Sequence, residues 1–175
     1  IIVDEAQDFL LIWWGVLEGC LRDETSRMAI FYDERQKIFD RDTAIPQWGM
    51  VCTLRENFRN TKQILRAIKP LCDSGLVSHR DCIEGKPPKV YQQGSPKKTR
   101  EQVGDLLEKL VAREGIRPKQ IAILTPRSPA NSSLKGAREL SGVPISHSVE
   151  AWPEGVLHSS ISGFKGLEAD IVILV

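Results

Sequence analysis

The chain begins with Ile-Ile-Val-Asp-Glu-Ala-Gln-Asp-Phe at residues 1–9, and the interpretation of everything after it depends on this stretch. A short β-branched run that ends in acids indicates a buried strand whose C-terminal tip presents carboxylates, where open α/β sheets bind ligands. Asp4 and Glu5 are these carboxylates. At a nucleotide site the first acid can hold Mg²⁺, and the second can orient or deprotonate an attacking water. A strand followed by an acidic helix N-cap gives the same pattern, so the later motifs must decide.

Length and composition limit the class of protein. With 175 residues and 41% hydrophobic side chains, the chain can form a substantial core. No apolar run approaches the roughly 20 residues that span a bilayer, and no signal-peptide pattern is present, so we expect a cytoplasmic protein without membrane contact. The cysteines are widely spaced without a Cys-x-x-Cys pair, which predicts buried thiols rather than disulfides or a zinc site. They are Cys20, Cys52, Cys72 and Cys82.

The charge changes sign along the chain. The whole chain carries 24 basic and 23 acidic residues, a formal net charge of +1, which alone argues neither for nor against nucleic acid. Residues 1–60 hold 7 basic and 11 acidic side chains, net −4, whereas residues 61–175 hold 17 and 12, net +5. This change suggests two units with different roles, the second better suited to a phosphate backbone.

Apolar periodicity predicts alternating helices and strands after the first strand. Thr61 is a candidate N-cap, and Thr99 with Gln102 fits a capping box. The helices are expected at about 10–22 with both Trp13 and Trp14 in the core, from Thr61 to Pro70, from Thr99 to just before Gly115, and at about 132–141. The strands are expected at 28–32, 89–92, 121–124, 143–146, 156–161 and 170–175. Such alternation is typical of an α/β fold with a parallel sheet.

Four polar motifs follow one another at the predicted strand tips and helix starts. The first two are Val3-Asp4-Glu5-Ala6-Gln7-Asp8 and Tyr32-Asp33-Glu34-Arg35-Gln36. The other two are Glu56-Asn57-Phe58-Arg59-Asn60 and Phe164-Lys165-Gly166-Leu167-Glu168. Together they resemble motifs II, III, IV and V of the UvrD/Rep-like superfamily 1 helicases, and the resemblance covers nearly the whole chain.

The resemblance implies an α/β fold of the RecA-like P-loop NTPase architecture with a parallel sheet. Residues 1–52 would be the C-terminal part of a first, ATP-binding RecA-like domain. Residues 53–175 would be a second RecA-like domain, truncated at its C-terminus. The implied activity is that of an ATP-dependent DNA helicase, with ATP and Mg²⁺ as cofactors and single-stranded DNA as partner.

The resemblance also assigns roles at the nucleotide site. Asp4 would bind Mg²⁺, and Glu5 would be the general base for the hydrolytic water. Gln36 would contact the γ-phosphate and couple the nucleotide state to the grip on DNA. Arg59 would act as an arginine finger, a role worth roughly 10³ to 10⁵ in rate in the systems where such fingers are known.

Gly166 and Glu168 belong to motif V, in which the acid contacts the ribose of the nucleotide and the glycine allows close backbone approach. Structural explanations compete with three of these assignments. Gln36 can serve only to satisfy a loop, and Arg59 can pair with Glu56 or Asp8. Glu168 can cap the turn of the last strand.

Four residues are candidates for contact with DNA. Phe39 lies where relatives carry an aromatic residue that stacks on a base, an interaction that contributes about 1–3 kcal/mol per base. A buried Phe is the alternative. Ser160 and Ser162 occupy positions where relatives have Thr and His, and their hydroxyls can still donate to a phosphate. Arg127 follows the strand at 121–124, and a surface role explains it equally well.

The sequence also departs from the family pattern. Tyr32 replaces the Gly that normally opens motif III, and no Gly-x-x-x-x-Gly-Lys-Ser/Thr phosphate loop occurs. The motif VI arginine is missing as well, so we expect a fragment whose active site lies partly outside it. Too few residues separate Arg59 from Lys165 for the large inserted subdomain of processive members. This suggests a simpler helicase, with a possible fused nuclease or other partner domain.

Two functions therefore stay open. The leading hypothesis is the motif II to motif V portion of an ATP-dependent DNA helicase or translocase that moves on single-stranded DNA, 3′ to 5′ as in its relatives. The alternative is a degenerate helicase-like module that binds nucleic acid or a protein partner without ATP turnover. A phosphate loop in the sequence before Ile1 would favour the enzyme, and its absence the binding module.

Overall fold

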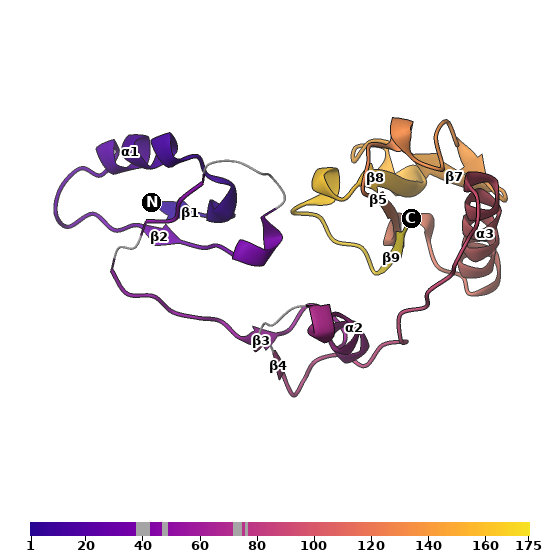
Figure 1. The fold of residues 1–175 in the computed structure, drawn as a ribbon, viewed down its shortest axis with the longest axis horizontal. Coiled ribbons are helices and arrows are strands. Elements are labelled where there is room, and N and C mark those ends of the chain that lie inside the picture. The colour runs from indigo at the N-terminus through magenta and orange to yellow at the C-terminus, as the bar shows by residue number, and fades with distance from the viewer. Residues whose placement is uncertain (38–42, 47–48, 72–74, 76) are drawn as a thin grey trace. The chain divides into compact units, whose positions relative to one another are not determined.

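The computed structural model of the chain describes residues 1–37, 43–46, 49–71, 75 and 77–175. The chain divides into two compact units, Ile1–Pro88 and Lys89–Val175 (Figure 1). The boundary near residue 52, which the sequence predicts between two RecA-like domains, stays a prediction. No helix within the described ranges is long and apolar enough to cross a membrane.

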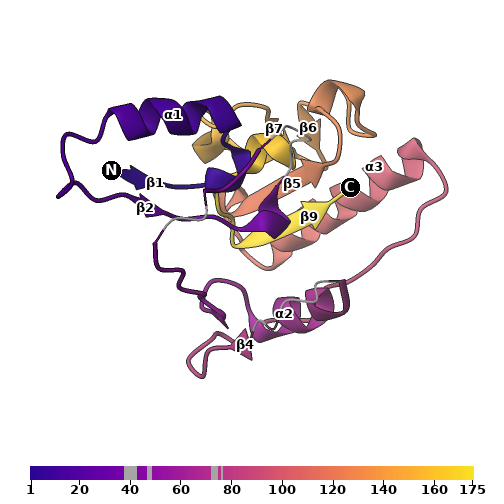
Figure 2. The same ribbon diagram turned by 60° about the vertical axis from the view of Figure 1, so that its left-hand side comes forward.

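The first unit begins with a strand, a helix and a second strand, in the order that the sequence predicts. Strand β1 (Ile2–Val3) pairs in parallel with β2 (Ala29–Ile30). Helix α1 (Leu11–Gly19) connects them and runs along the pair in both views (Figure 2). The small core between them contains the buried side chains of Val3, Ala6 and Trp14, with partly buried Phe9, Leu17, Met28 and Ile30 against it. The helix is shorter than the predicted 10–22.

Trp13 and Trp14 do not share the core that the sequence predicts for both. Trp14 is 3% exposed, whereas Trp13 is 41% exposed. Consecutive residues of a helix point about 100° apart, so only one of the pair can face the strands. Trp13 instead meets Phe9 edge to face, with ring centroids 5.3 Å apart.

The rest of the first unit contains a short strand pair and helix α2. Strand β3 (Glu56–Asn57) pairs in parallel with β4 (Val77–Ser78). Helix α2 (Lys62–Ile68) begins as predicted, because the Oγ1 of Thr61 accepts a hydrogen bond of 3.3 Å from the N–H of Ile64. A 3₁₀ turn at Lys69–Leu71 follows and contains Pro70, which agrees with the predicted end of the helix.

The second unit is built on a five-stranded sheet whose order is β6-β7-β8-β5-β9. All neighbouring strands are parallel except β6 and β7. The mixed α/β class with a mostly parallel sheet is therefore confirmed. The strands are β5 (Ile121–Thr125), β6 (Glu139–Leu140), β7 (Val143–Ser146), β8 (Val156–Ser160) and β9 (Ile171–Leu174). Every residue of β5 is buried, as expected for a central parallel strand covered on both faces.

Helix α3 (Pro96–Glu108) packs on this sheet through the fully buried Leu107 and the neighbouring Val103. It continues into a π-helical turn at Lys109–Arg113 and ends at Gly115, whose φ of 69° suits glycine. The predicted start at Thr99 is wrong. Ser95 caps the helix by accepting from the N–H of Lys98 at 3.3 Å, and the proline that follows it is favoured in the first turn.

Three further predictions from the sequence are corrected. Residues 132–141 form turns and β6 rather than a helix, because Gly136 has a φ of 72° and Ser132 bonds to its local backbone. Residues 89–92, all of them described, form no strand, and Val90 is 94% exposed without a partner strand to cover it. Of the cysteines predicted to be buried, Cys82 is buried but Cys20 and Cys52 are exposed, and Cys72 lies outside the described residues.

Candidate functional site

The carboxylates of motif II lie at the tip of β1, where the sequence places them. Asp4 is exposed, and its Oδ1 accepts a hydrogen bond of 2.9 Å from the backbone N–H of Glu5. Glu5 is half-buried and has a φ of 54°, in the left-handed region. Such a conformation is uncommon for a residue other than glycine, and residues held in it cluster at functional sites. The N–H of Ala6 donates to the carbonyl of Phe31 at 3.0 Å, so the sharp turn is fixed to the neighbouring strand.

Gln7 connects motif II to motif III. Its side chain is buried, and its Nε2 donates to Oε2 of Glu5 at 2.5 Å. Its Oε1 accepts from the backbone N–H of Asp33 at 3.0 Å. Both ends of the amide are therefore used, as a buried polar group requires. Gln7 was not predicted as a site residue. The sequence feature that could have identified it is a polar amide at a position where an apolar core residue is expected.

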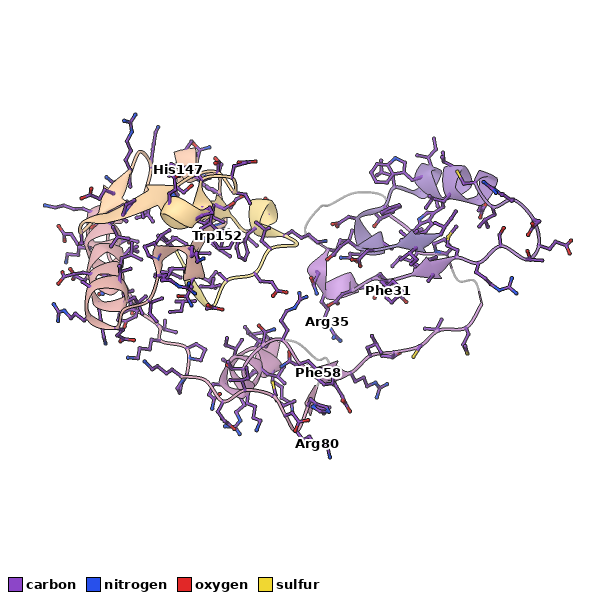
Figure 3. The ribbon with its side chains drawn as sticks, turned by 180° about the vertical axis from the view of Figure 1, so that it is seen from behind. Phe31, Arg35, Phe58, Arg80, His147 and Trp152 are labelled. Atoms are coloured by element: carbon purple, nitrogen blue, oxygen red, sulfur yellow. The ribbon has the colours of Figure 1, made fainter. Side chains whose placement is uncertain are left out.

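Motif III forms a 3₁₀ turn, Glu34–Gln36, directly after Asp33 (Figure 3 labels Arg35 within this turn and Phe31 before it). Asp33 caps this turn, since its Oδ1 accepts from the N–H of Arg35 at 3.0 Å. Its Oδ2 accepts from Nε2 of Gln36 at 2.9 Å. Asp33 was also missed by the sequence reasoning. The bond to Gln36 agrees with the structural explanation of that residue and leaves the nucleotide role open.

These contacts bring together three of the predicted site residues, Asp4, Glu5 and Gln36. We call the continuous path from Glu5 through Gln7 and Asp33 to Gln36 the amide relay. Arg59 lies in a different part of the same unit, in the turn between β3 and α2. Phe39 falls outside the described residues, so its predicted contact with DNA stays a prediction.

Ser160 and Ser162 meet at the C-terminal end of β8 in the second unit. Their Oγ atoms are 3.1 Å apart, and Oγ of Ser160 also accepts from the N–H of Gly163 at 3.0 Å. The N–H of Ile161 donates to the carbonyl of Thr125 at 2.9 Å, which joins this end of β8 to the end of β5. The structure thus brings the two predicted serines together, at an edge where parallel sheets place their ligand sites.

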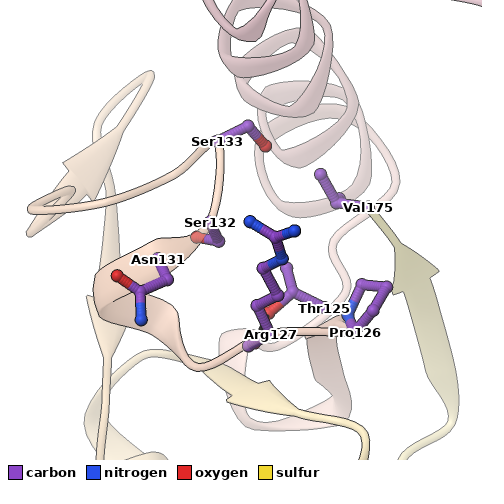
Figure 4. A pocket seen from close by; sticks show the side chains of 7 residues that line it. All are labelled: Thr125, Pro126, Arg127, Asn131, Ser132, Ser133 and Val175. Carbon is purple, nitrogen blue, oxygen red and sulfur yellow. Dashed lines mark hydrogen bonds between the residues drawn. The ribbon is translucent and has the colours of Figure 1, made fainter.

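Arg127 lines a small cavity of about 230 Å³ next to the end of β5 (Figure 4). Its backbone is fixed because Oγ1 of Thr125 donates to the carbonyl of Arg127 at 2.6 Å. The other lining residues are Pro126, Asn131, Ser132, Ser133 and Val175. The polar loop residues among these were not predicted, although a Ser- and Asn-rich loop after a strand tip is a sequence signal for such a site.

Motif V follows β8 as an exposed segment held by its apolar residues. Phe164 contacts Trp152 with ring centroids 5.9 Å apart, and Leu167 packs on the face of the sheet formed by β5 and β8. Gly166 has a φ of 82°, a conformation that explains why a glycine stands there. Glu168 is exposed. Its predicted contact with a ribose is not tested by these observations.

His158 is the most deeply buried titratable group of the second unit. It lies in β8 with no exposed surface, and its Nε2 is 3.3 Å from Oγ of Ser132. Burial, together with the nearby His147 ring at 5.2 Å, lowers the pKa of His158 to about 4. The imidazole is therefore neutral at neutral pH and belongs to the packing of the sheet.

No protein-family model matches the chain, and a search of curated proteins finds no match. Among the described residues, no group of three or more His, Cys, Asp or Glu side chains is arranged to hold a metal ion. A magnesium ion held by one carboxylate, a phosphate-loop hydroxyl and nucleotide phosphates requires no such group, so Asp4 stays a candidate.

Proposed function

We propose that the chain is the motif II to motif V portion of an ATP-dependent DNA helicase or translocase that acts on single-stranded DNA. The proposal rests mainly on the amide relay. In it, a carboxylate at a strand tip is joined through buried and charged groups to a glutamine 31 positions later in the sequence. A relay of this kind is expected where the state of a bound phosphate must be communicated to another part of the protein.

The chemistry of the strand tip fits a magnesium nucleotide. Asp4 is exposed, and carboxylate oxygens are ligands that Mg²⁺ prefers. The bond from the N–H of Glu5 to Oδ1 fixes the direction of the Asp4 carboxylate. Bound Mg²⁺ would neutralise charge on the phosphates. Asp4 would hold this ion together with groups of a phosphate loop outside the 175 residues.

Glu5 would act on water rather than on the phosphates. Its Oε2 is held by Gln7, so the carboxylate keeps one orientation when water is in place. As the water attacks the γ-phosphate, Glu5 would accept its proton. Gln36 would contact the same phosphate group. Release of this phosphate after hydrolysis would free the Gln36 side chain, and the amide relay would pass the change to Asp33 and Gln7.

The second unit would supply contacts to the DNA backbone. Arg127 lines a small cavity, and the hydroxyls of Ser160 and Ser162 lie side by side at the neighbouring strand tip. Arginine and serine side chains are among the groups that contact phosphates without reading sequence. A helicase that tracks along any DNA requires contacts of this type.

The deciding experiment measures ATP hydrolysis by the full-length parent protein with and without single-stranded DNA. DNA-stimulated turnover that Glu5→Gln abolishes would support the proposal. Glu24→Gln is the matched control, because Glu24 is an exposed acid in a turn that belongs to none of the four motifs. Binding of single-stranded DNA without any ATP turnover would instead favour the degenerate binding module.

A further inference from the structure

The turn that carries Arg59 is fixed at both ends by one side chain. Nδ2 of Asn57 donates to the carbonyl of Asn60 at 2.7 Å, and Oδ1 of Asn57 accepts from the N–H of Asn60 at 3.2 Å. Asn57 therefore closes a ring around Phe58 and Arg59, using its amide in both directions. Only asparagine has both groups at this reach, since aspartate lacks the donor and glutamine is one methylene longer.

A buried thiol supports the same turn from the other side. Sγ of Cys82 donates to the carbonyl of Asn60 at 2.9 Å, and it is 3.4 Å from Nδ2 of Asn57. Cys82 is 7% exposed, the most buried of the described cysteines, and its own N–H donates to the carbonyl of His79 at 3.0 Å. The carbonyl of Asn60 thus accepts hydrogen bonds from two side chains, those of Asn57 and Cys82.

The aromatic residue next to Arg59 is also held. Phe58 stacks on the ring of His79, with centroids 4.2 Å apart and planes at 27° (Phe58 is labelled in Figure 3). The backbone N–H of His79 donates to the carbonyl of Asn57 at 3.1 Å, and its Nε2 is 3.7 Å from a carboxylate oxygen of Glu56. Phe58 remains 64% exposed, so stacking rather than burial in a core orients it.

We propose that Asn57, Cys82 and His79 are positioning residues for Arg59. We call the three the motif IV clamp. The proposal rests on the proposed function, because it takes Arg59 to be the arginine that acts on the transferring phosphoryl group. A guanidinium on an exposed turn must be ordered before the reaction to contribute fully, and a displacement of about 1 Å of a catalytic group can cost on the order of 10²-fold in rate.

The test uses the full-length parent protein and compares turnover with nucleotide affinity. Asn57→Ala should lower kcat by roughly 10²-fold while KM for ATP changes little, because the clamp acts on a group used in the transition state. In an Arg59→Ala background, Asn57→Ala should produce no further loss. Cys20→Ala, which alters an exposed cysteine, should leave both constants unchanged.

Conservative variants separate positioning from general stability. Cys82→Ser keeps a donor for the carbonyl of Asn60 and should retain most of the turnover, whereas Cys82→Ala removes that donor and should lose most of it. His79→Phe keeps the stacking on Phe58 and should likewise exceed His79→Ala in kcat. Rescue of this kind is not expected if the three residues only stabilise the fold.

The outcomes distinguish this proposal from the proposed function. If the parent protein turns over ATP and Arg59→Ala impairs it, but Asn57→Ala is additive with Arg59→Ala, the clamp proposal alone is overturned. If Arg59→Ala has no effect, or the parent protein shows no turnover, the proposed function fails and the clamp proposal falls with it.

Discussion

Nε2 of Gln7 donates a hydrogen bond of 2.5 Å to Oε2 of Glu5, and this contact fixes the carboxylate at the tip of β1. The orientation of the amide is not arbitrary. Its oxygen must face the N–H of Asp33, which lies 3.0 Å away, so its nitrogen must face Glu5. A side chain that packs into the small core of the first unit thereby sets the geometry of an exposed site.

Gln7→Ala is expected to lower ATP turnover of the full-length protein by about 10- to 100-fold, because Glu5 loses its orientation. It should also lower the free energy of unfolding by about 1–3 kcal/mol, since partly buried polar partners are left unpaired. Steady-state kinetics and urea denaturation measure the two effects. Gln93→Ala is the control, because Gln93 is exposed and bonds only to Gln102 at 3.2 Å among the described residues. Unchanged turnover in Gln7→Ala would contradict the amide relay.

Glu5→Gln and Asp4→Asn should separate catalysis from binding. Glu5→Gln removes the group that accepts the proton of water, so hydrolysis should nearly vanish while affinity for Mg²⁺-ATP is retained. Asp4→Asn removes a charged ligand of Mg²⁺, so affinity should fall as well. Calorimetric binding of Mg²⁺-ATP, measured beside the rate of phosphate release, distinguishes the two. Equal loss of binding in both variants would contradict the assigned roles.

Arg59→Ala should lower kcat by roughly 10³-fold or more with little change in nucleotide affinity, as expected of an arginine finger. Arg59→Lys should restore little, because an ammonium cannot contact two oxygens with a planar fork. Single-turnover hydrolysis in the presence of single-stranded DNA is the measurement. Turnover at the parental rate in Arg59→Ala would show that Arg59 has a structural role.

The strands were the part of the fold that sequence patterns predicted best. The runs at 121–124, 143–146, 156–161 and 170–175 all form strands, because short apolar stretches between turn residues have few other structures available. Hydrophobic patterns failed where hydrogen bonds from polar side chains to the nearby backbone determine the local structure. Ser132 bonds to the carbonyl of Pro129 and to the N–H of Leu134, and these bonds favour turns over the predicted helix. The two-residue strands β3 and β4 are too short to produce any periodicity.

The sequence predicted the candidate residues at the two ends of the amide relay but not the two side chains that link them. Asp4 and Glu5 were predicted because acids at a strand tip indicate phosphate chemistry, and Gln36 was predicted from the resemblance to motif III. Gln7 and Asp33 were missed because their importance lies in which atoms they meet across 26 residues of sequence. Periodicity and residue type carry no information on such side-chain pairs.

The free energy of unfolding of the chain should fall as the pH drops from about 6.5 to about 4. His158 has its pKa lowered to about 4 by burial, so in this range the unfolded chain binds a proton that the folded chain does not. The contribution is fully present above the ordinary histidine pKa near 6.5 and is lost below it. Urea denaturation at several pH values compares the chain with His158→Leu, in which this part of the pH dependence should disappear. Carboxyl groups contribute equally to both proteins, and an unchanged difference across the range would contradict the prediction.

The chain of 175 residues is expected to show no ATPase activity by itself, although it contains Asp4, Glu5 and Gln36. Its sequence holds no phosphate loop, and backbone amides and a lysine of such a loop are needed to hold the β- and γ-phosphates. The side chains of the amide relay cannot replace that cradle, because each of the four is either an acid or hydrogen-bonded to one.

Weak, salt-sensitive binding of single-stranded DNA is expected instead, carried by residues 61–175 with their net charge of +5. Phosphate release from the purified chain, with and without single-stranded DNA, tests the expected lack of ATPase activity. Fluorescence anisotropy of labelled DNA at two salt concentrations tests the expected DNA binding. Glu5→Gln serves as the control for contaminating ATPases. Turnover that follows the chain through purification and disappears in Glu5→Gln would show that the nucleotide site is complete within these residues.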